Sequence, residues 1–156
     1  MKYLVLENIR SAYNVGAMFR TADGAGIDKI FLIGHTPTPI DRFGRPQSEI
    51  QKTSLGASEY IPWEHYESAQ SMLLQLQSKG VCVVAVEQTK NSISITDYLE
   101  PLQVAYVLGN EVEGVSQTIL DIADTIIELP MLGKKESLNV SVTAGIVLYH
   151  GITKEK

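Results

Sequence analysis

Residues 125–149 read TIIELPMLGKKESLNVSVTAGIVLY. The first five, residues 125–129, are typical of a short buried strand, and Pro130 ends its hydrogen-bonded ladder. A loop with two lysines follows, and Ser137 and Asn139 then open an apolar helix. A strand that leads through a polar loop into a capped helix is where α/β proteins hold small ligands, because free backbone N–H groups converge there. This stretch therefore predicts an α/β fold with a ligand site at the loop.

Strands and helices alternate along the rest of the chain. Apolar runs predict strands at residues 2–6, 29–33, 81–87 and 103–108, and residues 59–62 could form another. Helical periodicity predicts helices at 11–24, 66–79, 116–123 and from Asn139 to about His150. The run at 81–87 is apolar throughout, as in a strand inside a parallel sheet. Without repeats or an evident linker, we expect residues 1–156 to form a single α/β domain with a mostly parallel sheet flanked by helices.

Composition excludes several classes of protein. The single cysteine, Cys82, lies in an apolar run and is expected to be a core residue, so no internal disulfide can form. One cysteine and three scattered histidines cannot complete a structural zinc site, and we expect no metal. No apolar run is long enough to span a bilayer, and no signal peptide is expected. These features fit a cytoplasmic protein. The net charge of −5 gives nucleic-acid binding no support of its own.

The first stretch that could carry chemistry is residues 8–26. Gly16 and Arg20 share a helix face that is distinct from the apolar stripe. A glycine inside a helix costs about 1 kcal/mol relative to alanine, which makes sense if something must approach the backbone beside Arg20. The alternative is a surface arginine paired with Asp23, on a helix that uses Gly16 for ordinary packing. Spacing alone favours this alternative.

The second stretch, residues 108–116, reads LGNEVEGVS. Glycines at both ends of this turn, Gly109 and Gly114, allow a ligand to rest on backbone groups. The sequence contains neither the dinucleotide fingerprint G-x-G-x-x-G nor the phosphate-binding loop G-x-x-x-x-G-K-[ST]. As a bare pattern the stretch could be only a tight connection. Helix capping is likewise the default explanation for Ser137 or Asn139 taken alone.

Taken in order, the three stretches resemble the motifs of the SpoU family of RNA 2′-O-ribose methyltransferases, within the SPOUT class. Asn14 with Arg20 matches the first motif, the Leu-Gly-Asn-Glu-Val-Glu-Gly-Val run matches the second, and the Leu-Pro-Met and Ser-Leu-Asn-Val-Ser-Val runs match the third. Each motif is weak alone, but three in this order are specific, and together they cover the chain from Glu7 to about Gly151. The resemblance implies a SPOUT-type domain whose C-terminal segment forms a deep trefoil knot, one of the rare exceptions to unknotted topology.

The resemblance also implies S-adenosylmethionine as methyl donor, held largely by backbone in the late loops. The positions carried over for donor binding are Gly109, Asn110, Glu111, Leu129, Pro130, Met131, Ser137, Leu138, Asn139 and Val140. The strand end at Glu87 and Gln88 is a further candidate wall of this pocket, although it matches no sharp motif. The catalytic hypothesis gives Arg20 the task of positioning the target ribose and its phosphate, with supporting roles for Asn14, Glu111, Ser137 and Asn139.

Family members are homodimers whose first-motif arginine reaches an active site formed with the other subunit, so the resemblance implies the same here. No separate RNA-binding domain is expected, and tRNA or rRNA must then contact the domain itself. The candidate contacts are Arg20, Arg42, Arg45, Lys52, Lys134 and Lys135. Two alternatives stay open: a catalytically inactive RNA-binding or interaction module on the same fold, and methylation of a small molecule. Retention of all five polar residues of the catalytic hypothesis argues against loss of activity.

Overall fold

The computed structural model describes residues 1–152, and the last four residues of the expected domain lie outside this range. Seven strands form one sheet in the order β3-β2-β1-β6-β4-β7-β5, and every pairing between them is parallel. The strands are β1 Lys2–Glu7, β2 Lys29–Ile33, β3 Trp63–Tyr66, β4 Cys82–Val86, β5 Ile93–Ser94, β6 Val104–Leu108 and β7 Thr125–Glu128. The predicted α/β class with a mostly parallel sheet is confirmed.

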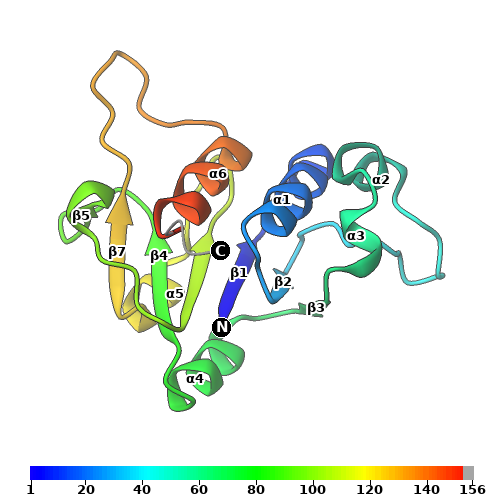
Figure 1. Cartoon of the computed structure of the whole chain (residues 1–156), viewed down its shortest axis with the longest axis horizontal. Coiled ribbons are helices and arrows are strands. Elements are labelled where there is room, and N and C mark those ends of the chain that lie inside the picture. The colour runs from blue at the N-terminus through cyan, green and yellow to red at the C-terminus, as the bar shows by residue number, and fades with distance from the viewer. Residues whose placement is uncertain (153–156) are drawn as a thin grey trace.

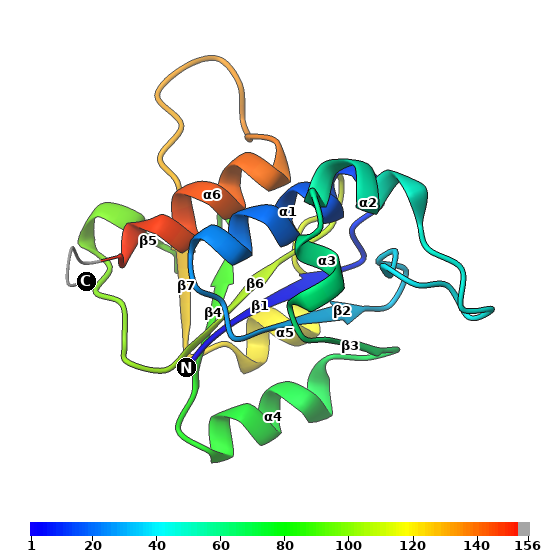
Figure 2. The same ribbon diagram turned by 45° about the vertical axis from the view of Figure 1, so that its right-hand side comes forward.

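Helices cover both faces of the sheet (Figure 1). They are α1 Ala12–Gly24, α2 Ser48–Ser54, α3 Ala57–Tyr60, α4 Gln70–Ser78, α5 Gln117–Ile122 and α6 Val140–His150, with a 3₁₀ turn η1 at Ile95–Asp97. Helices α1, α2, α3 and α6 lie on one face, and α4 and α5 lie on the other (Figure 2). Alternate residues of each strand point to opposite faces. Leu4 and Leu6 therefore join the core under α1 and α6, whereas Val5 joins the core under α4 and α5.

The strand predicted at 59–62 is wrong, and the helix predicted at 66–79 is confirmed with a later start. The strand proposed at 59–62 overlaps helix α3, and the strand itself lies a few residues later, at β3. The helix proposed at 66–79 begins only at Gln70, because Tyr66 belongs to β3. Pairing with β2 decides this region: Ile30 N–H donates to the carbonyl of Pro62, and Gly34 N–H donates to the carbonyl of Tyr66. Tertiary pairing thus overrides the weak local pattern.

The parallel sheet gathers its functional loops at one edge. Parallel strands end at the same edge, so the segments after β1, β4, β6 and β7 meet there. The longest of these near the C-terminus is the β7–α6 loop, residues 129–139, which stands away from the sheet (Figures 1 and 2). Helix α6 then returns along α1. The trefoil knot stays a prediction.

At the opposite edge, a nearly buried polar cluster holds the end of α6 to the sheet. Lys2 Nζ lies 2.8 Å from Glu100 Oε1 and donates to the carbonyl of Leu148 at 3.1 Å. The Tyr106 hydroxyl donates to Glu100 Oε2 at 2.6 Å. Burial and this bond to Glu100 raise the pKa of Tyr106 far above its usual range. The cluster therefore joins β1, β6 and the last turn of α6 through one lysine and one carboxylate.

Replacing Lys2 by Met should lower the free energy of unfolding by about 2–3 kcal/mol, because it leaves Glu100 charged and nearly buried without a cation. The side chains of Lys2 and Glu100 are only 14% and 16% exposed. The matched control is Lys29→Met, which breaks an ion pair with Glu64 whose side chains are 29% and 45% exposed. This control should cost less than about 1 kcal/mol. Urea unfolding measures the stability of both variants. An equal loss of stability in the two would contradict the structural role given to the Lys2–Glu100 pair.

Candidate functional site

Two adjoining cavities form a cleft at the carboxyl edge of the sheet. Their volumes are about 720 and 100 Å³, and the larger one is of the size that holds small molecules. The walls come from the end of β4 (residues 86–89), the turn after β6 (108–117) and the segment from β7 into α6 (128–143). Both cavities share Val86, Glu87, Gln88, Ser137, Leu138 and Thr143, so we treat them as one space, the strand-end cleft.

The turn after β6 is closed by its own hydrogen bonds. Asn110 N–H donates to the carbonyl of Gly114 at 3.1 Å, and Gly114 N–H donates back to the carbonyl of Asn110 at 2.8 Å. A Cβ at Gly109 would lie 2.2 Å from Val115 N, and Gly114 has a φ of +73°. The turn itself therefore requires both glycines. Their presence needs no ligand to explain it.

The second motif is bound to the first through Glu111 and Asn110. The Glu111 carboxylate accepts hydrogen bonds from the backbone N–H groups of Arg10, at 3.0 Å, and Ser11, at 3.2 Å. Asn110 Nδ2 donates to the carbonyl of Asn8 at 2.8 Å. Burial alone would raise the pKa of Glu111, but these N–H donors outweigh it and leave the pKa below its ordinary value. Glu111 thus stays ionised and fixes the segment that precedes α1.

The third motif meets the first at the start of two neighbouring helices. Ser11 caps α1 by accepting from Asn14 N–H at 3.2 Å. Asn139 caps α6: its Oδ1 accepts from Ser141 N–H at 2.8 Å, and its Nδ2 donates to Asn14 Oδ1 at 3.3 Å. The predicted cap at Asn139 is confirmed. The structure therefore brings Asn14 and Asn139 together.

Most of the positions proposed for donor binding line the strand-end cleft. These are Gly109, Asn110, Glu111, Leu129, Met131, Ser137, Leu138 and Val140. Pro130 and Asn139 do not line it, although each is next to a residue that does. Glu87 and Gln88 line both cavities, in agreement with the wall proposed at that strand end. Thr143 on α6 also faces both cavities, and the sequence offered no signal for it because it lies past the motif.

Arg20 lies outside the cleft of its own chain. It follows Asn14 by six residues, which places it about 9 Å further along α1. There it lines a separate hollow with Lys52 and Tyr149. Within residues 1–152 no ion pair joins Arg20 to Asp23.

Gly16, on the same helix, is explained by packing. Its missing Cβ would lie 2.5 Å from the carbonyl oxygen of Ile50 in α2, so a close approach of helices needs this glycine. The ordinary packing alternative for this residue is therefore the one that the structure supports. The approach that Gly16 permits is by a neighbouring helix of the same chain, and it brings Lys52 of α2 close to Arg20.

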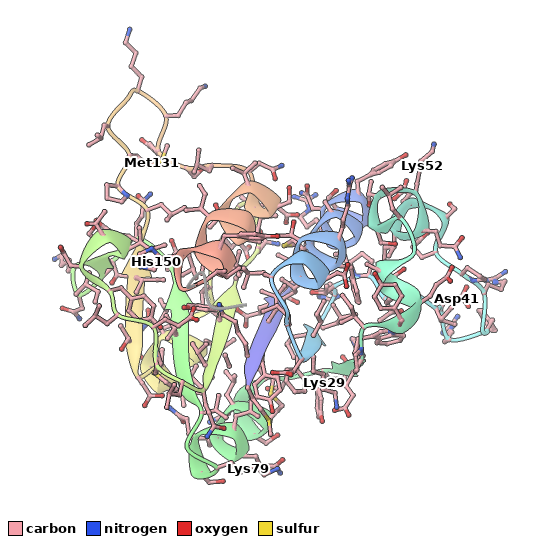
Figure 3. The ribbon with its side chains drawn as sticks, in the orientation of Figure 1. Lys29, Asp41, Lys52, Lys79, Met131 and His150 are labelled. Carbon is pink, nitrogen blue, oxygen red and sulfur yellow. The ribbon has the colours of Figure 1, made fainter. Side chains whose placement is uncertain are left out.

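The basic residues proposed for RNA contact fall into separate groups. The guanidinium groups of Arg42 and Arg45 lie 4.7 and 4.9 Å from the centre of the Phe43 ring, and Arg45 pairs with Asp41 at 2.9 Å. Lys134 and Lys135 lie in the β7–α6 loop with Met131. In Figure 3, Asp41 and Lys52 lie on the opposite side of the molecule from Met131. The five residues therefore do not form one continuous patch.

A third hollow next to the cleft contains two basic candidates, Arg10 and His35, that sequence reasoning missed. Its volume is about 490 Å³, and Arg10 and His35 line it together with Asn8, Asn110, Val112 and Glu113. Arg10 lies three residues after the end of β1, and His35 lies in the turn after β2, so their positions just past strand ends were the available signal.

None of the helices in residues 1–152 is long and apolar enough to cross a membrane. In the same part of the chain, His, Cys, Asp and Glu side chains do not gather in threes around a point that could hold a metal ion.

The fold and the cleft define a class: a parallel α/β domain whose ligand site is built from strand-end loops. The model of the SpoU rRNA Methylase family matches residues 1–149. The chain belongs to this family, as its three motifs predicted.

Relatives and solved structures agree with this assignment. The chain is 31% identical over 150 residues to the 23S rRNA (guanosine-2′-O-)-methyltransferase RlmB of Ralstonia nicotianae, covering 96% of this chain and 57% of the relative. It is 32% identical over 145 residues to the tRNA (guanosine(18)-2′-O)-methyltransferase of Aquifex aeolicus, covering 92% and 64%. The chain thus spans about three-fifths of the length of these relatives.

Among solved structures, the A. aeolicus TrmH/SpoU tRNA modifying enzyme superposes with a TM-score of 0.84 at 28% identity, covering 96% of this chain and 73% of that one. The AdoMet-bound rRNA methyltransferase from Sinorhizobium meliloti also gives a TM-score of 0.84, at 26% identity, covering 96% and 55%. Both likenesses extend over nearly all of the described sheet and its helices.

The geometry of the turn predicts that Gly114→Ala destabilises the protein by about 2 kcal/mol. The left-handed backbone costs a non-glycine residue about 1–2 kcal/mol. The new Cβ would also lie 2.1 Å from Glu87 Oε2, which accepts from Val115 N–H. Gly133→Ala is the matched control, because a Cβ there meets no atom within 4 Å, and it should change stability by less than about 0.5 kcal/mol. Thermal unfolding measures the stability of both variants. A Gly114→Ala protein as stable as the parent would contradict the requirement for glycine in this turn.

Proposed function

We propose that this chain is an S-adenosylmethionine-dependent RNA 2′-O-ribose methyltransferase acting on tRNA or rRNA. The observation that carries the proposal is the strand-end cleft, in which segments of the second and third motifs line one space. The first motif is bound to both through Glu111 and Asn139. The names of the relatives, which are 2′-O-methyltransferases of rRNA and tRNA, support the same reaction. We place the reaction in the cytoplasm, where an unpaired thiol such as Cys82 is usual.

The cleft fits the proposed donor in size and in chemistry. Its larger cavity, at about 720 Å³, is big enough for a nucleoside with an amino-acid tail. Leu129, Met131 and Leu138 offer apolar surface for a flat base, while the turn after β6 offers polar groups. When bound, S-adenosylmethionine supplies a methyl group activated by a positively charged sulfur. The AdoMet-bound relative from Sinorhizobium meliloti supports this choice of donor.

The protein's own task is mainly alignment. In-line transfer to a ribose hydroxyl requires the 2′-oxygen to be held opposite the departing sulfur, and the hydroxyl must lose its proton. We assign the positioning of the ribose and its phosphate to Arg20, and the support of that geometry to Asn14, Glu111, Ser137 and Asn139. We do not assign the base to Arg20, because a guanidinium group keeps its proton in proteins. A phosphate of the RNA or a water molecule accepts the proton instead.

We further propose that the enzyme is a homodimer. Val142, Ile146 and Tyr149 are exposed at spacings of four and three on α6, so they form an apolar strip that faces away from the core. Tyr149 also lines the hollow that contains Arg20. A second copy on this strip would cover the apolar surface and could bring Arg20 to the cleft of its partner. Arg20 lies outside its own cleft, so the site is incomplete without such a partner.

The proposed RNA contacts lie outside the cleft. Arg42 and Arg45 lie against the Phe43 ring, Lys52 lies in α2 beside the hollow of Arg20, Lys134 and Lys135 lie in the β7–α6 loop, and Arg10 and His35 line the hollow next to the cleft. So few cations predict few phosphate contacts and modest salt dependence of RNA binding. The inactive RNA-binding module is the less favoured function, because all five residues of the catalytic hypothesis are present. Asn14, Glu111, Ser137 and Asn139 lie at the carboxyl edge of the sheet, and Arg20 is the residue that we propose the partner supplies.

The direct test is titration calorimetry with S-adenosylmethionine, followed by transfer of a labelled methyl group to bulk tRNA and rRNA. We expect saturable donor binding and label in 2′-O-methylated nucleosides. Donor binding without transfer to either RNA would favour the inactive module, and absence of donor binding would refute the proposal.

Arg20→Ala should lower kcat by about 100-fold or more, because misplacing the ribose by about 1 Å has an effect of that size. The Kd for the donor should stay the same, since the proposed role of Arg20 is to hold the ribose and its phosphate and not the donor. Lys79→Ala removes a positive charge at an exposed position at the end of α4, away from the cleft and from the proposed RNA contacts, and should leave kcat unchanged. Single-turnover methylation measures both variants. An Arg20→Ala enzyme with the parental rate would remove Arg20 from the mechanism.

Ile146→Asp should convert the dimer into monomers, because it places a charge in the middle of the apolar strip. Leu102→Asp is the matched control: Leu102 is almost fully exposed but lies between η1 and β6, far from α6 in sequence and off the strip. Sedimentation velocity should give a dimer for the parent and for Leu102→Asp. A parent protein that sediments as a monomer at micromolar concentration would contradict the dimer proposal.

A further inference from the structure

The strand-end cleft has acidic walls. The side chains that contribute carboxylates to its lining are Glu87, Glu111, Glu113, Glu128 and Glu136. Among the described residues, no lysine, arginine or histidine lines either cavity. None of the five glutamates forms an ion pair within residues 1–152. A cleft with walls of one charge sign attracts ligands of the opposite sign. The cavity is therefore suited to a ligand that carries net positive charge.

Glu87 occupies the central position among these carboxylates. It follows β4 directly and lines both cavities. Its Oε2 accepts from Val115 N–H at 3.0 Å, and its Oε1 accepts from Gln88 N–H at 2.9 Å. The absence of a side chain at Gly114 leaves room for this carboxylate, since a Cβ there would lie 2.1 Å from Oε2. Glu87 is thus a half-buried anion held in a fixed orientation.

The other four glutamates are less well placed to act on a bound ligand. Glu111 is engaged by the N–H groups that precede α1, and Glu128 accepts from the Ser92 hydroxyl at 2.7 Å. Glu113 and Glu136 are exposed, so water screens their charges. Glu87 alone among the five lies in the wall that both cavities share.

We propose that Glu87 makes the cleft selective for the charged methyl donor over the product, S-adenosylhomocysteine; this inference rests on the proposed function. Transfer forms a bond between the ribose 2′-oxygen and the methyl carbon and breaks the carbon–sulfur bond. The electron pair of that bond stays on sulfur, and the hydroxyl proton leaves to a phosphate or water. Sulfur thereby loses its positive charge. The attraction between Glu87 and the sulfonium charge of the donor is therefore lost in the product, which favours exchange of product for fresh donor.

A purely structural role for Glu87 gives a different expectation. The side chain links the end of β4 to the turn after β6, so it could serve only to shape the cleft. Glu87→Gln separates the two roles, because the amide oxygen can still accept from Val115 N–H while the negative charge is lost. Loss of shape weakens donor and product binding by the same factor. Loss of charge changes the ratio of the two affinities.

The experiment is titration calorimetry of the full chain with S-adenosylmethionine and S-adenosylhomocysteine, for the parent and for Glu87→Gln. We expect the Kd for the donor to rise about tenfold in the variant, equivalent to about 1.4 kcal/mol. The Kd for the product should change by less than about twofold, equivalent to about 0.4 kcal/mol. Sinefungin, which carries an ammonium group in place of the methylsulfonium, should follow the donor.

Glu67→Gln is the matched control, because Glu67 is exposed between β3 and α4 and does not line the cleft. It should leave both affinities unchanged. If Glu87→Gln weakens the binding of donor and product by the same factor, the proposal is overturned and Glu87 has only a structural role. If that variant does not fold, the affinities of the parent protein test the proposal. The parent must bind sinefungin more tightly than S-adenosylhomocysteine, and equal affinities would overturn the proposal. A parent that binds none of the three ligands would instead refute the proposed function.

Discussion

The carboxylate of Glu111 joins parts of the chain that are a hundred residues apart. It accepts hydrogen bonds from the backbone N–H groups of Arg10 and Ser11, so the turn after β6 fixes the start of α1. Ser11 caps that helix, Asn14 in its first turn meets Asn139, and Asn139 caps α6. Three motifs that are distant in sequence are thus held together by one series of side-chain hydrogen bonds. The geometry of the cleft depends on this series of hydrogen bonds, because the turn after β6 and the start of α6, which form two of its walls, are both part of the series.

The distribution of charge divides the surface between two kinds of ligand. The cleft is lined by glutamates, whereas Lys134 and Lys135 stand on the β7–α6 loop above it without lining it. Phosphates of RNA are repelled from acidic walls, while a cationic donor is attracted to them. The net charge of −5 therefore does not show that acidic and basic side chains lie in separate regions of the surface. Anionic substrate and cationic donor are expected to approach the reacting atoms from different sides.

Secondary structure could be predicted from the sequence where an element has a regular apolar pattern. It could not be predicted where an element exists only because it pairs with a neighbouring strand. Strand β6 was predicted because its residues are apolar throughout, β2 because all of its residues after Lys29 are apolar, and α1 because its stripe repeats at helical spacing. Strand β3 has four residues, WEHY, that carry no such pattern, and only its pairing with β2 makes it a strand. β5 has two residues and was missed for the same reason.

The site divides in a similar way. Motif spacing identified the residues on the turn after β6 and at the start of α6, but it could not reveal that Arg20 lies outside the cleft of its own chain. Neither could it assign a role to Glu87, because the bond from Val115 N–H joins segments 28 residues apart. Distances of this kind arise from the order of strands in the sheet, with β6 placed between β1 and β4. The position of helix α6 likewise depends on contacts that its own sequence does not reveal. Its first residue lines the cleft, while Lys2 holds the carbonyl of Leu148 at its other end, so the position of the cleft depends on contacts at both edges of the sheet.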